Sequence, residues 1–206
     1  MASAIIHIAI AKKVAEKVKV DNLKDYYLGA IAPDVAKQVG SSRTESHFIK
    51  NSNDIPNIKL FIKRYPFFKY NSFDLGYFTH LYADKIWNEY YVTNIKQNDS
   101  IKLLDGTFMN TTKEEYLNLI YADYTNLNID LITKYDIDLS LFYEDFDKPK
   151  TSIVEIPVDK LDILINKMSI IIANSKQEKT YLIDIYDVVN YIEKTANEII
   201  ELLKKY

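Results

Sequence analysis

The sequence predicts an all-α protein. Only 4 glycines and 5 prolines interrupt its 206 residues, and long stretches repeat apolar residues at helical spacing. Hydrophobic residues make up 48% of the chain, which is enough to form a buried core. No repeat or low-complexity linker divides the sequence. We therefore expect residues 1–206 to form one helical domain.

The first helix is predicted over residues 4–18. Ser3 precedes it and belongs to the residue types that cap helices. Its apolar side chains recur every four positions, at Ile6, Ile10, Val14 and Val18. A second, short helix should end near Ile31, because Pro33 disfavours the helical conformation of the residue before it.

Helices and connections alternate through the rest of the chain. Asn71 or Ser72 can cap one helix, and Thr112 can cap another with Glu115 at capping-box spacing. The irregular stretch 136–158 contains a short candidate strand at 153–158, so one strand pair in the second half is allowed. The helices that begin at these caps are predicted at 72–95 and 112–134. Further helices are predicted at 55–69, 159–174 and 179–204, with connections at 38–53 and 98–110.

Composition excludes several functions and locations. The net charge of −3 argues against a stable nucleic-acid complex, which normally needs a basic face. The chain has no cysteine, so disulfides and thiolate metal sites are excluded. No basic region precedes the first apolar residues, as it would in a secretory signal, and no apolar run approaches the ~18–20 residues of a membrane span. We expect a cytoplasmic protein; its oligomeric state is not predicted.

The three histidines are the most informative residues. His80 and Asp84 are four positions apart within a predicted helix, so they should lie on one face with Cβ atoms about 5–6 Å apart. A cation can bind both without bending the backbone. Zinc accepts imidazole nitrogen and carboxylate oxygen. His7, His47 and Asp34 are further candidate donors, and the five together would suffice for one zinc, or for two with a bridging carboxylate. Another divalent metal remains an alternative.

The ordinary alternatives stay open at this stage. A His-x-x-x-Asp pair occurs by chance in many helices, and a single histidine is more often packed or solvated than metal-bound. If the site exists, two metals about 3.5–4 Å apart would suit a phosphate ester.

The segment Leu75-Gly76-Tyr77-Phe78-Thr79-His80-Leu81-Tyr82-Ala83-Asp84 resembles the Leu-Gly-x-x-x-His-x-x-x-Asp helix of bacterial zinc-dependent phospholipases C. The fold is shared with single-strand-specific zinc nucleases. The opening Ser-Ala-Ile-Ile-His and the segment Gly-x-Ile-Ala-Pro-Asp ending at Asp34 are similar to a short cytoplasmic branch of that superfamily. The resemblance covers about residues 1–95.

The resemblance implies specific roles. Asp34, His47, His80 and Asp84 would bind one zinc, and Asp84 would also bridge to a second metal held by His7. Met1 stands where the family has a processed tryptophan, so we expect that terminal ligand to be absent or replaced.

The family's third metal site should be missing. It needs a histidine six residues after the bridging aspartate, where this chain has Tyr90, and a second histidine downstream, although none follows His80.

Four residues are candidates for the reaction and for substrate binding. Asp34 could orient or deprotonate a metal-activated water. Arg43 could pair with a phosphate, Trp87 could form a pocket wall, and Asp123 could replace a missing ligand or contact substrate. The ordinary alternatives are that Arg43 is solvated, that Trp87 belongs to the core and that Asp123 is solvated.

The predicted function is a zinc-dependent phosphoric ester hydrolase, with a phosphodiester as the first choice of substrate. The substrate would be a small molecule or a lipid headgroup. An HD-type phosphohydrolase ranks lower, because Phe48 follows His47 and Leu81 follows His80 where that class needs an adjacent aspartate. The alternative from another class is a structural or non-catalytic metal-binding domain descended from such an enzyme.

Overall fold

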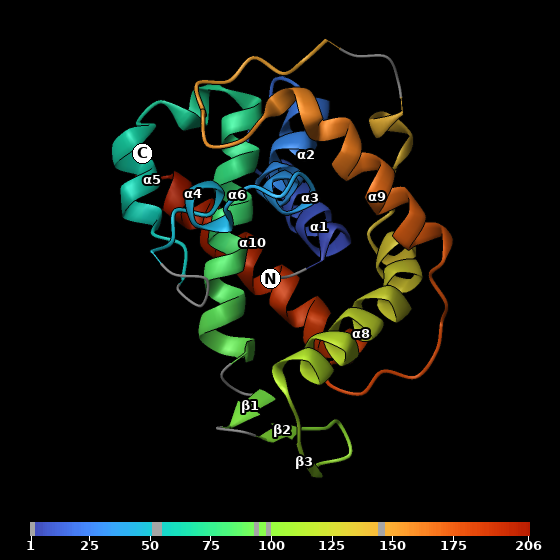
Figure 1. Ribbon diagram of the computed structural model, residues 1–206. Helices are drawn as coiled ribbons and strands as arrows, with labels where there is room; N and C mark the ends of the chain where they lie inside the picture. Colours follow the sequence, from blue (N-terminus) through green and yellow to red (C-terminus); the bar gives the residue numbers. More distant parts are fainter. Residues whose placement is uncertain (1–2, 51–54, 93–94, 98–99, 144–146) are drawn as a thin grey trace.

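The computed structural model describes residues 3–50, 55–92, 95–97, 100–143 and 147–206. It is mostly helical, which confirms the predicted all-α class (Figure 1). The α-helices are α1 (Ala4–Ala15), α2 (Leu23–Ile31), α3 (Val35–Gln38), α4 (Arg43–Ser46), α5 (Ile58–Arg64), α6 (Ser72–Ile86), α8 (Lys113–Lys134), α9 (Leu161–Ala173) and α10 (Ile185–Leu203). Shorter turns are the 3-10 helices η1 (Ala32–Asp34), η2 (Phe68–Tyr70), η4 (Ser140–Phe142) and η5 (Val158–Lys160), and the π-helical turn η3 (Trp87–Val92).

The predicted helix caps are present. The Ser3 side chain accepts a hydrogen bond from the Ile6 amide, and that of Asn71 accepts one from the Asp74 amide. Thr112 and Glu115 form the full capping box at the start of α8. These side chains satisfy amide groups that have no partner within the helix, and so fix where each helix begins.

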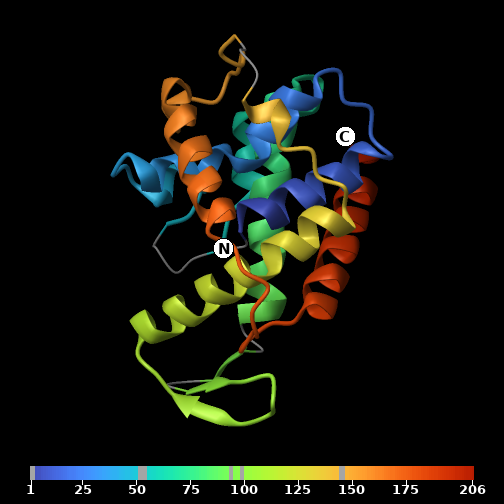
Figure 2. The ribbon, with the colours of Figure 1, turned by 90° about the vertical axis from the view of Figure 1, so that its right-hand side faces the viewer.

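A small antiparallel sheet occupies part of the predicted connection 98–110. Strand β1 (Lys96–Gln97) pairs with β2 (Ser100–Lys102), and β2 pairs with β3 (Phe108–Asn110). In this register Ile101 lies opposite Met109. Ile101 is fully buried, so the sheet is anchored to the core although it projects below the helices (Figure 2).

Other predicted boundaries differ from the structure. Residues 153–158 do not form a strand, because Pro157 lacks an amide donor and the Val154 amide bonds instead to the side chains of Tyr65 and Glu155. The first helix ends at Ala15 instead of residue 18. The predicted loop 38–53 contains the one-turn helix α4.

Helices α2 and α6 are packed unusually closely. A Cβ atom built on Gly29 would lie 2.0 Å from the backbone oxygen of Phe73, and one on Gly76 would lie 2.0 Å from that of Tyr26. Only glycine at both positions permits this approach. The contact brings the Ala30 carbonyl on α2 beside the His80 ring on α6, with 2.8 Å between the oxygen and Nδ1.

Helix α6 lies at the centre of the molecule. It contacts α1, α2, α5 and α10, and the Tyr191 hydroxyl of α10 donates to the Ala83 carbonyl at 2.7 Å. Helix α8 packs against α1 and α9, and α9 also contacts α3 (Figures 1 and 2). Among the described residues, no helix has both the length and the apolar character needed to cross a bilayer.

We predict that Gly76→Ala destabilises the protein by about 3 kcal/mol, because the new methyl group must displace the α2 backbone. Urea unfolding followed by circular dichroism measures this. Asn166→Ala, at an exposed position inside α9, is the control and should change the free energy of unfolding by less than about 0.5 kcal/mol. Equal stability of Gly76→Ala and the parent would contradict the close helix contact.

Candidate metal centre

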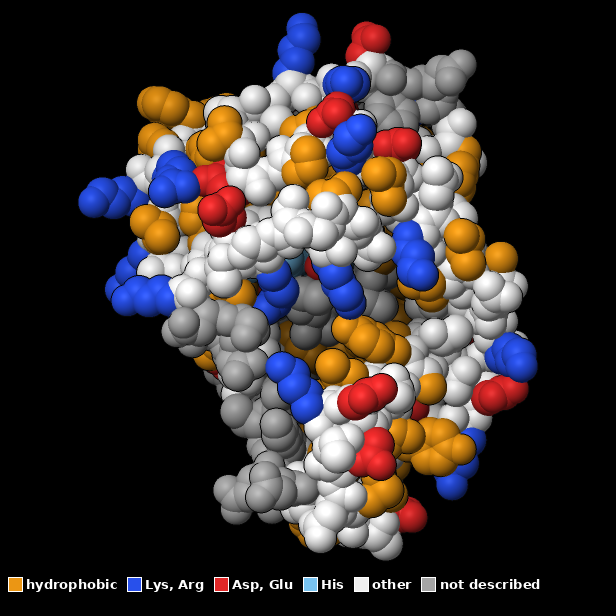
Figure 3. All heavy atoms as spheres, viewed as in Figure 1, with side chains coloured by type: hydrophobic (Ala, Val, Ile, Leu, Met, Phe, Trp, Pro, Cys, Tyr) orange, Lys and Arg blue, Asp and Glu red, His pale blue; other side chains and the backbone are white. Residues whose placement is uncertain are grey.

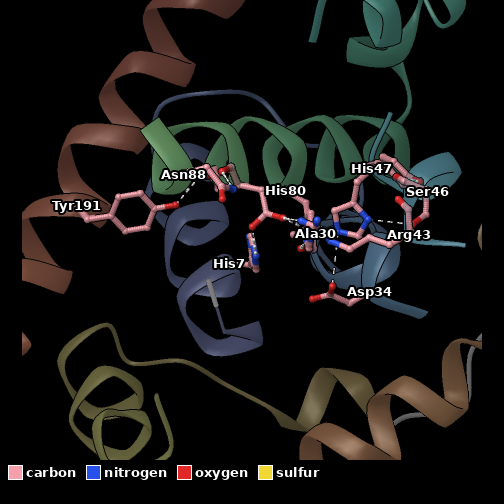
Figure 4. A network of polar contacts seen from close by, with 12 residues as sticks. His7, Ala30, Asp34, Arg43, Ser46, His47, His80, Asn88 and Tyr191 are labelled. Carbon is pink, nitrogen blue, oxygen red and sulfur yellow. Dashed lines mark hydrogen bonds and ion pairs between the residues drawn. The ribbon is translucent and has the colours of Figure 1, made fainter. Parts of the chain in front are cut away.

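Five polar side chains from four separate segments meet beside α6 (Figure 4). His7 lies on α1, Asp34 ends η1, His47 follows α4, and His80 and Asp84 are one turn apart on α6. The three histidines and Asp84 are at most 1% exposed, whereas the Asp34 side chain is 17% exposed. The structure therefore brings together all five residues that the sequence predicted as metal ligands.

Asp84 is at the middle of the cluster. Its Oδ1 lies 3.5 Å from His7 Nε2, and its Oδ2 lies 3.6 Å from His47 Nε2 and 3.9 Å from His80 Nε2. Asp34 Oδ1 lies 3.6 Å from His47 Nε2. Two overlapping sets of donors are close enough to hold a cation, His7 with Asp34 and His80, and His47 with His80 and Asp84.

The orientation of the His80 ring suits a ligand. Its Nδ1 lies 2.8 Å from the Ala30 carbonyl, and a carbonyl oxygen can only accept. The proton is therefore on Nδ1, which leaves the Nε2 lone pair of the neutral ring directed into the cluster. Burial lowers the pKa of His80 to about 3, so the ring is neutral at neutral pH. His47 is oriented in a comparable way, with Nδ1 2.8 Å from Ser46 Oγ.

The cluster contains polar atoms that the described residues do not satisfy. His80 Nε2 and His47 Nε2 are not among them, because they lie within hydrogen-bonding distance of each other at 3.3 Å. Both ring nitrogens of His7 and Oδ1 of Asp34 are buried without a hydrogen-bond partner among these residues. Buried polar atoms without partners are costly, and a cation among them would remove that cost. The donor set of imidazoles and carboxylates thus fits a divalent metal such as zinc.

Both carboxylates are ionised at neutral pH. Burial alone would raise the pKa of Asp34, but the close contact with His47 and the electrostatic interactions with His80 and His47 lower it to about 2. Burial also opposes ionisation of Asp84, yet surrounding positive charge and the contact with His7 hold its pKa well below the usual value. Two negative charges at one buried place favour a cation there.

Arg43 reaches the same centre. Its Nη2 lies 3.2 Å from Asp84 Oδ2, and its side chain is 24% exposed. The guanidinium therefore adds positive charge at the solvent-facing side of the cluster. This position agrees with the predicted contact to a substrate phosphate, which stays a prediction.

The end of α6 is held by two side chains. Asn88 donates to the Asp84 carbonyl at 2.7 Å, and Tyr191 donates to the Ala83 carbonyl (Figure 4). Here the α-helix passes into the π-helical turn at Trp87, a backbone irregularity that is frequent at functional sites. These bonds restrain the backbone that carries Asp84.

Trp87 and Asp123 lie in structural positions. Trp87 is 1% exposed and packs against the rings of Tyr124 and Tyr191, with centroids 5.9 and 4.9 Å away. The structure therefore argues against the predicted contact of Trp87 with substrate. Asp123 is fully buried, and its carboxylate accepts backbone hydrogen bonds from residues 181–183.

The bonds to Asp123 correct the proposed replacement ligand. The three amides lie 2.6 to 3.1 Å from its carboxylate oxygens, so the group is already satisfied. They also hold residues 181–183 out of a helix, and the next residue, Asp184, caps α10. This explains why the last helix begins at Ile185 and not near residue 179.

A cavity of about 590 Å³ begins at Asp34. Its walls come from the start of α1, the η1–α3 segment, α8 and α9, and they include Lys37 and Lys167. Figure 3 shows a hollow on one face of the molecule with basic and apolar side chains around it. Sequence reasoning missed both lysines. Only Lys37 had a signal in the sequence, because it follows Asp34 by one helical turn.

The fold and the cluster define a helical protein with a buried histidine–aspartate centre. A family model described as zinc dependent phospholipase C matches residues 6–100, a range that includes all five cluster residues. This match supports membership of the chain in the zinc-dependent phospholipase C-like superfamily, as the sequence resemblance predicted. At a coarse level the family is one of zinc-dependent hydrolases. Searches of curated proteins and of solved structures gave no match.

We predict that Asp123→Ala lowers the free energy of unfolding by about 3 kcal/mol, since three buried amides lose a charged acceptor. The metal content should stay the same, because Asp123 contributes nothing to the centre. Chemical denaturation and elemental analysis test the two statements. Asp162→Ala, at an exposed position on α9, is the control. Loss of bound metal in folded Asp123→Ala would restore the ligand role that the structure argues against.

Proposed function

We propose that this protein is a metal-dependent phosphoric ester hydrolase, with phosphodiesters as its first class of substrate. The observation that carries the proposal is the buried cluster of His7, Asp34, His47, His80 and Asp84, whose unsatisfied donor atoms fit one or two zinc ions. The family match agrees with hydrolase chemistry. A bound zinc ion acts as a Lewis acid and lowers the pKa of a water ligand.

The five cluster residues would hold one or two metal ions. His47, His80 and Asp84, with Asp34, would hold the first ion, and Asp84 with His7 would hold a second. No histidine follows His80 in the sequence, so the third site of the family has no counterpart built from histidines. We therefore propose a centre with at most two metals.

Asp34 suits the role of orienting water. It is the only cluster carboxylate with measurable exposure, and it lies on the wall of the cavity. A carboxylate with a pKa of about 2 is a weak base but a good hydrogen-bond acceptor. We propose that it accepts a hydrogen bond from the attacking water and aligns it, and that a stronger base or bulk solvent takes the proton.

Arg43 suits the role of binding the phosphoryl oxygens. Its guanidinium is already beside Asp84 at the exposed side of the centre. A planar guanidinium can donate two parallel hydrogen bonds to a phosphate. This contact would hold the ester beside the metal ligands and stabilise negative charge that develops on the oxygens.

The competing function is a structural metal site. Such a site is closed by protein ligands, whereas a catalytic site keeps a position open to solvent or substrate. The cavity that begins at Asp34 favours the catalytic reading.

The test measures hydrolysis of bis(para-nitrophenyl) phosphate and of para-nitrophenyl phosphate by protein stripped with a chelator and then titrated with zinc. We expect activity to return at about one to two equivalents of zinc, and His80→Ala and Asp84→Asn to lower it by at least about 100-fold. Asp162→Asn is the control. Circular dichroism checks folding, and the metal titration of the parent needs no variant. Folded, zinc-loaded parent that hydrolyses neither ester would overturn the proposal.

In the same assay, Arg43→Ala should keep its zinc and lose about 100-fold in kcat/KM, because the phosphoryl group loses a charged donor. Arg43→Lys should recover part of the loss, since it restores charge without the paired hydrogen bonds. Unchanged kcat/KM in Arg43→Ala would show that the arginine serves only as a partner for Asp84.

A further inference from the structure

Three of the four segments that wall the cavity beside Asp34 each contribute one helix face. Asp34, Lys37 and Gln38 are three and four positions apart in the continuous η1–α3 segment. Helix α8 contributes residues at the spacing 121, 124, 125 and 128, and α9 contributes 164, 167, 168, 171 and 172. Residues at these spacings share a helix face. The cavity is thus a regular feature of the helix packing, and it shares Asp34 with the metal centre.

The wall formed by α9 is apolar. It presents Leu164, Met168, Ile171 and Ile172 to the cavity, and Ile171 is 41% exposed. Tyr121 on α8 is also 41% exposed. Large side chains left this accessible around a concave space suit the apolar body of a ligand.

Two lysines give the cavity its charge. Within the described residues neither Lys37 nor Lys167 forms an ion pair, and Asp34 is the only carboxylate on the walls. The Lys37 ammonium donates to the Tyr121 hydroxyl at 3.1 Å and lies 4.9 Å from the centre of that ring. This contact holds Lys37 between the α3 and α8 walls. Asp34 interacts with the histidines, so the lysines determine the charge of the rest of the cavity.

Building on the proposed hydrolase function, we propose that this cavity binds the organic part of the phosphate ester and that Lys37 and Lys167 select esters with a second negative charge. The substrate class is then an ester that combines an apolar body with an anionic group beyond the scissile phosphate. Helices α8 and α9, and with them Lys167, lie outside the matched residues 6–100, whereas Lys37 lies within them.

Calorimetry with two inert probes tests the proposal on the zinc-loaded protein. Diphenylphosphinate has one negative charge, and its para-carboxy derivative has two; neither contains a bond that the enzyme can hydrolyse. We expect the carboxylated probe to bind about tenfold more tightly to the parent. Lys37→Ala and Lys167→Ala should each bind that probe about threefold more weakly and bind the singly charged probe with unchanged affinity. Lys37→Arg and Lys167→Arg should retain the preference.

The control is Lys59→Ala, which removes an exposed lysine of α5, outside the cavity. Equal binding of the two probes by the parent, or a preference that survives in the Lys37→Ala/Lys167→Ala double variant, would overturn the proposal. Absence of binding by both probes would also overturn it.

The outcome is separable from that of the proposed function. A lysine-dependent preference in a protein that hydrolyses no ester would support the cavity assignment and contradict the hydrolase proposal. Hydrolysis with no lysine-dependent preference would support the hydrolase proposal and contradict the cavity assignment. Competition by short-chain phosphatidylinositol monophosphate, but not by short-chain phosphatidylinositol, would identify a lipid source of the second charge. Competition by a soluble nucleotide ester alone would identify a soluble source.

Discussion

Asp84 is an ionised carboxylate without solvent exposure, and compensating its charge is the constraint on which the site depends. A buried charge is costly unless it is paired. Among the described residues, its contacts include three imidazoles and Arg43, and the distances of 3.5 to 3.9 Å to the imidazoles are longer than good hydrogen bonds. Separations of that size leave room for an ion between donors. A metal would compensate the charge of Asp84 and would bind the buried atoms of His7 and Asp34 that have no hydrogen-bond partner among the described residues.

The contacts around α6 position the side chains that surround Asp84. The glycine contact between α2 and α6 places the Ala30 carbonyl where it fixes the proton on His80 Nδ1. On the next turn, Tyr191 and Asn88 bind the carbonyls of Ala83 and Asp84. The Ala30 carbonyl, Tyr191 and Asn88 would not bind an ion themselves. They restrain the direction of the ligand side chains, which is the usual role of groups behind a metal site.

Local rules predicted the parts of the structure that depend on neighbours in sequence. The caps at Ser3, Asn71 and Thr112 and the shared face of His80 and Asp84 follow from helix geometry over three or four residues. The convergence of His7, Asp34 and His47 on that face could be expected only through the family resemblance. Nothing in their own spacing requires it, because they lie on three different segments.

Residues with distant partners were not predictable in this way. The sequence allows Asp123 to be a substitute ligand or a solvated residue, yet the partners of its carboxylate are amides 58 to 60 positions further along the chain. The segment 153–158 is a candidate strand by its local sequence, but the Val154 amide donates to the Tyr65 hydroxyl and not to a neighbouring strand. Lys37 and Lys167 acquire a common role only when α3 and α9 pack together, so no local pattern connects them.

The most direct test of the central claim is anomalous diffraction at the zinc edge from crystals grown with zinc. We predict one or two anomalous peaks in the cluster, at about 2.0–2.2 Å from Nε2 of His47 and His80 and from an oxygen of Asp84. Peaks confined to the protein surface, or an empty cluster in which the His47 and His80 rings still bond to each other, would contradict the account.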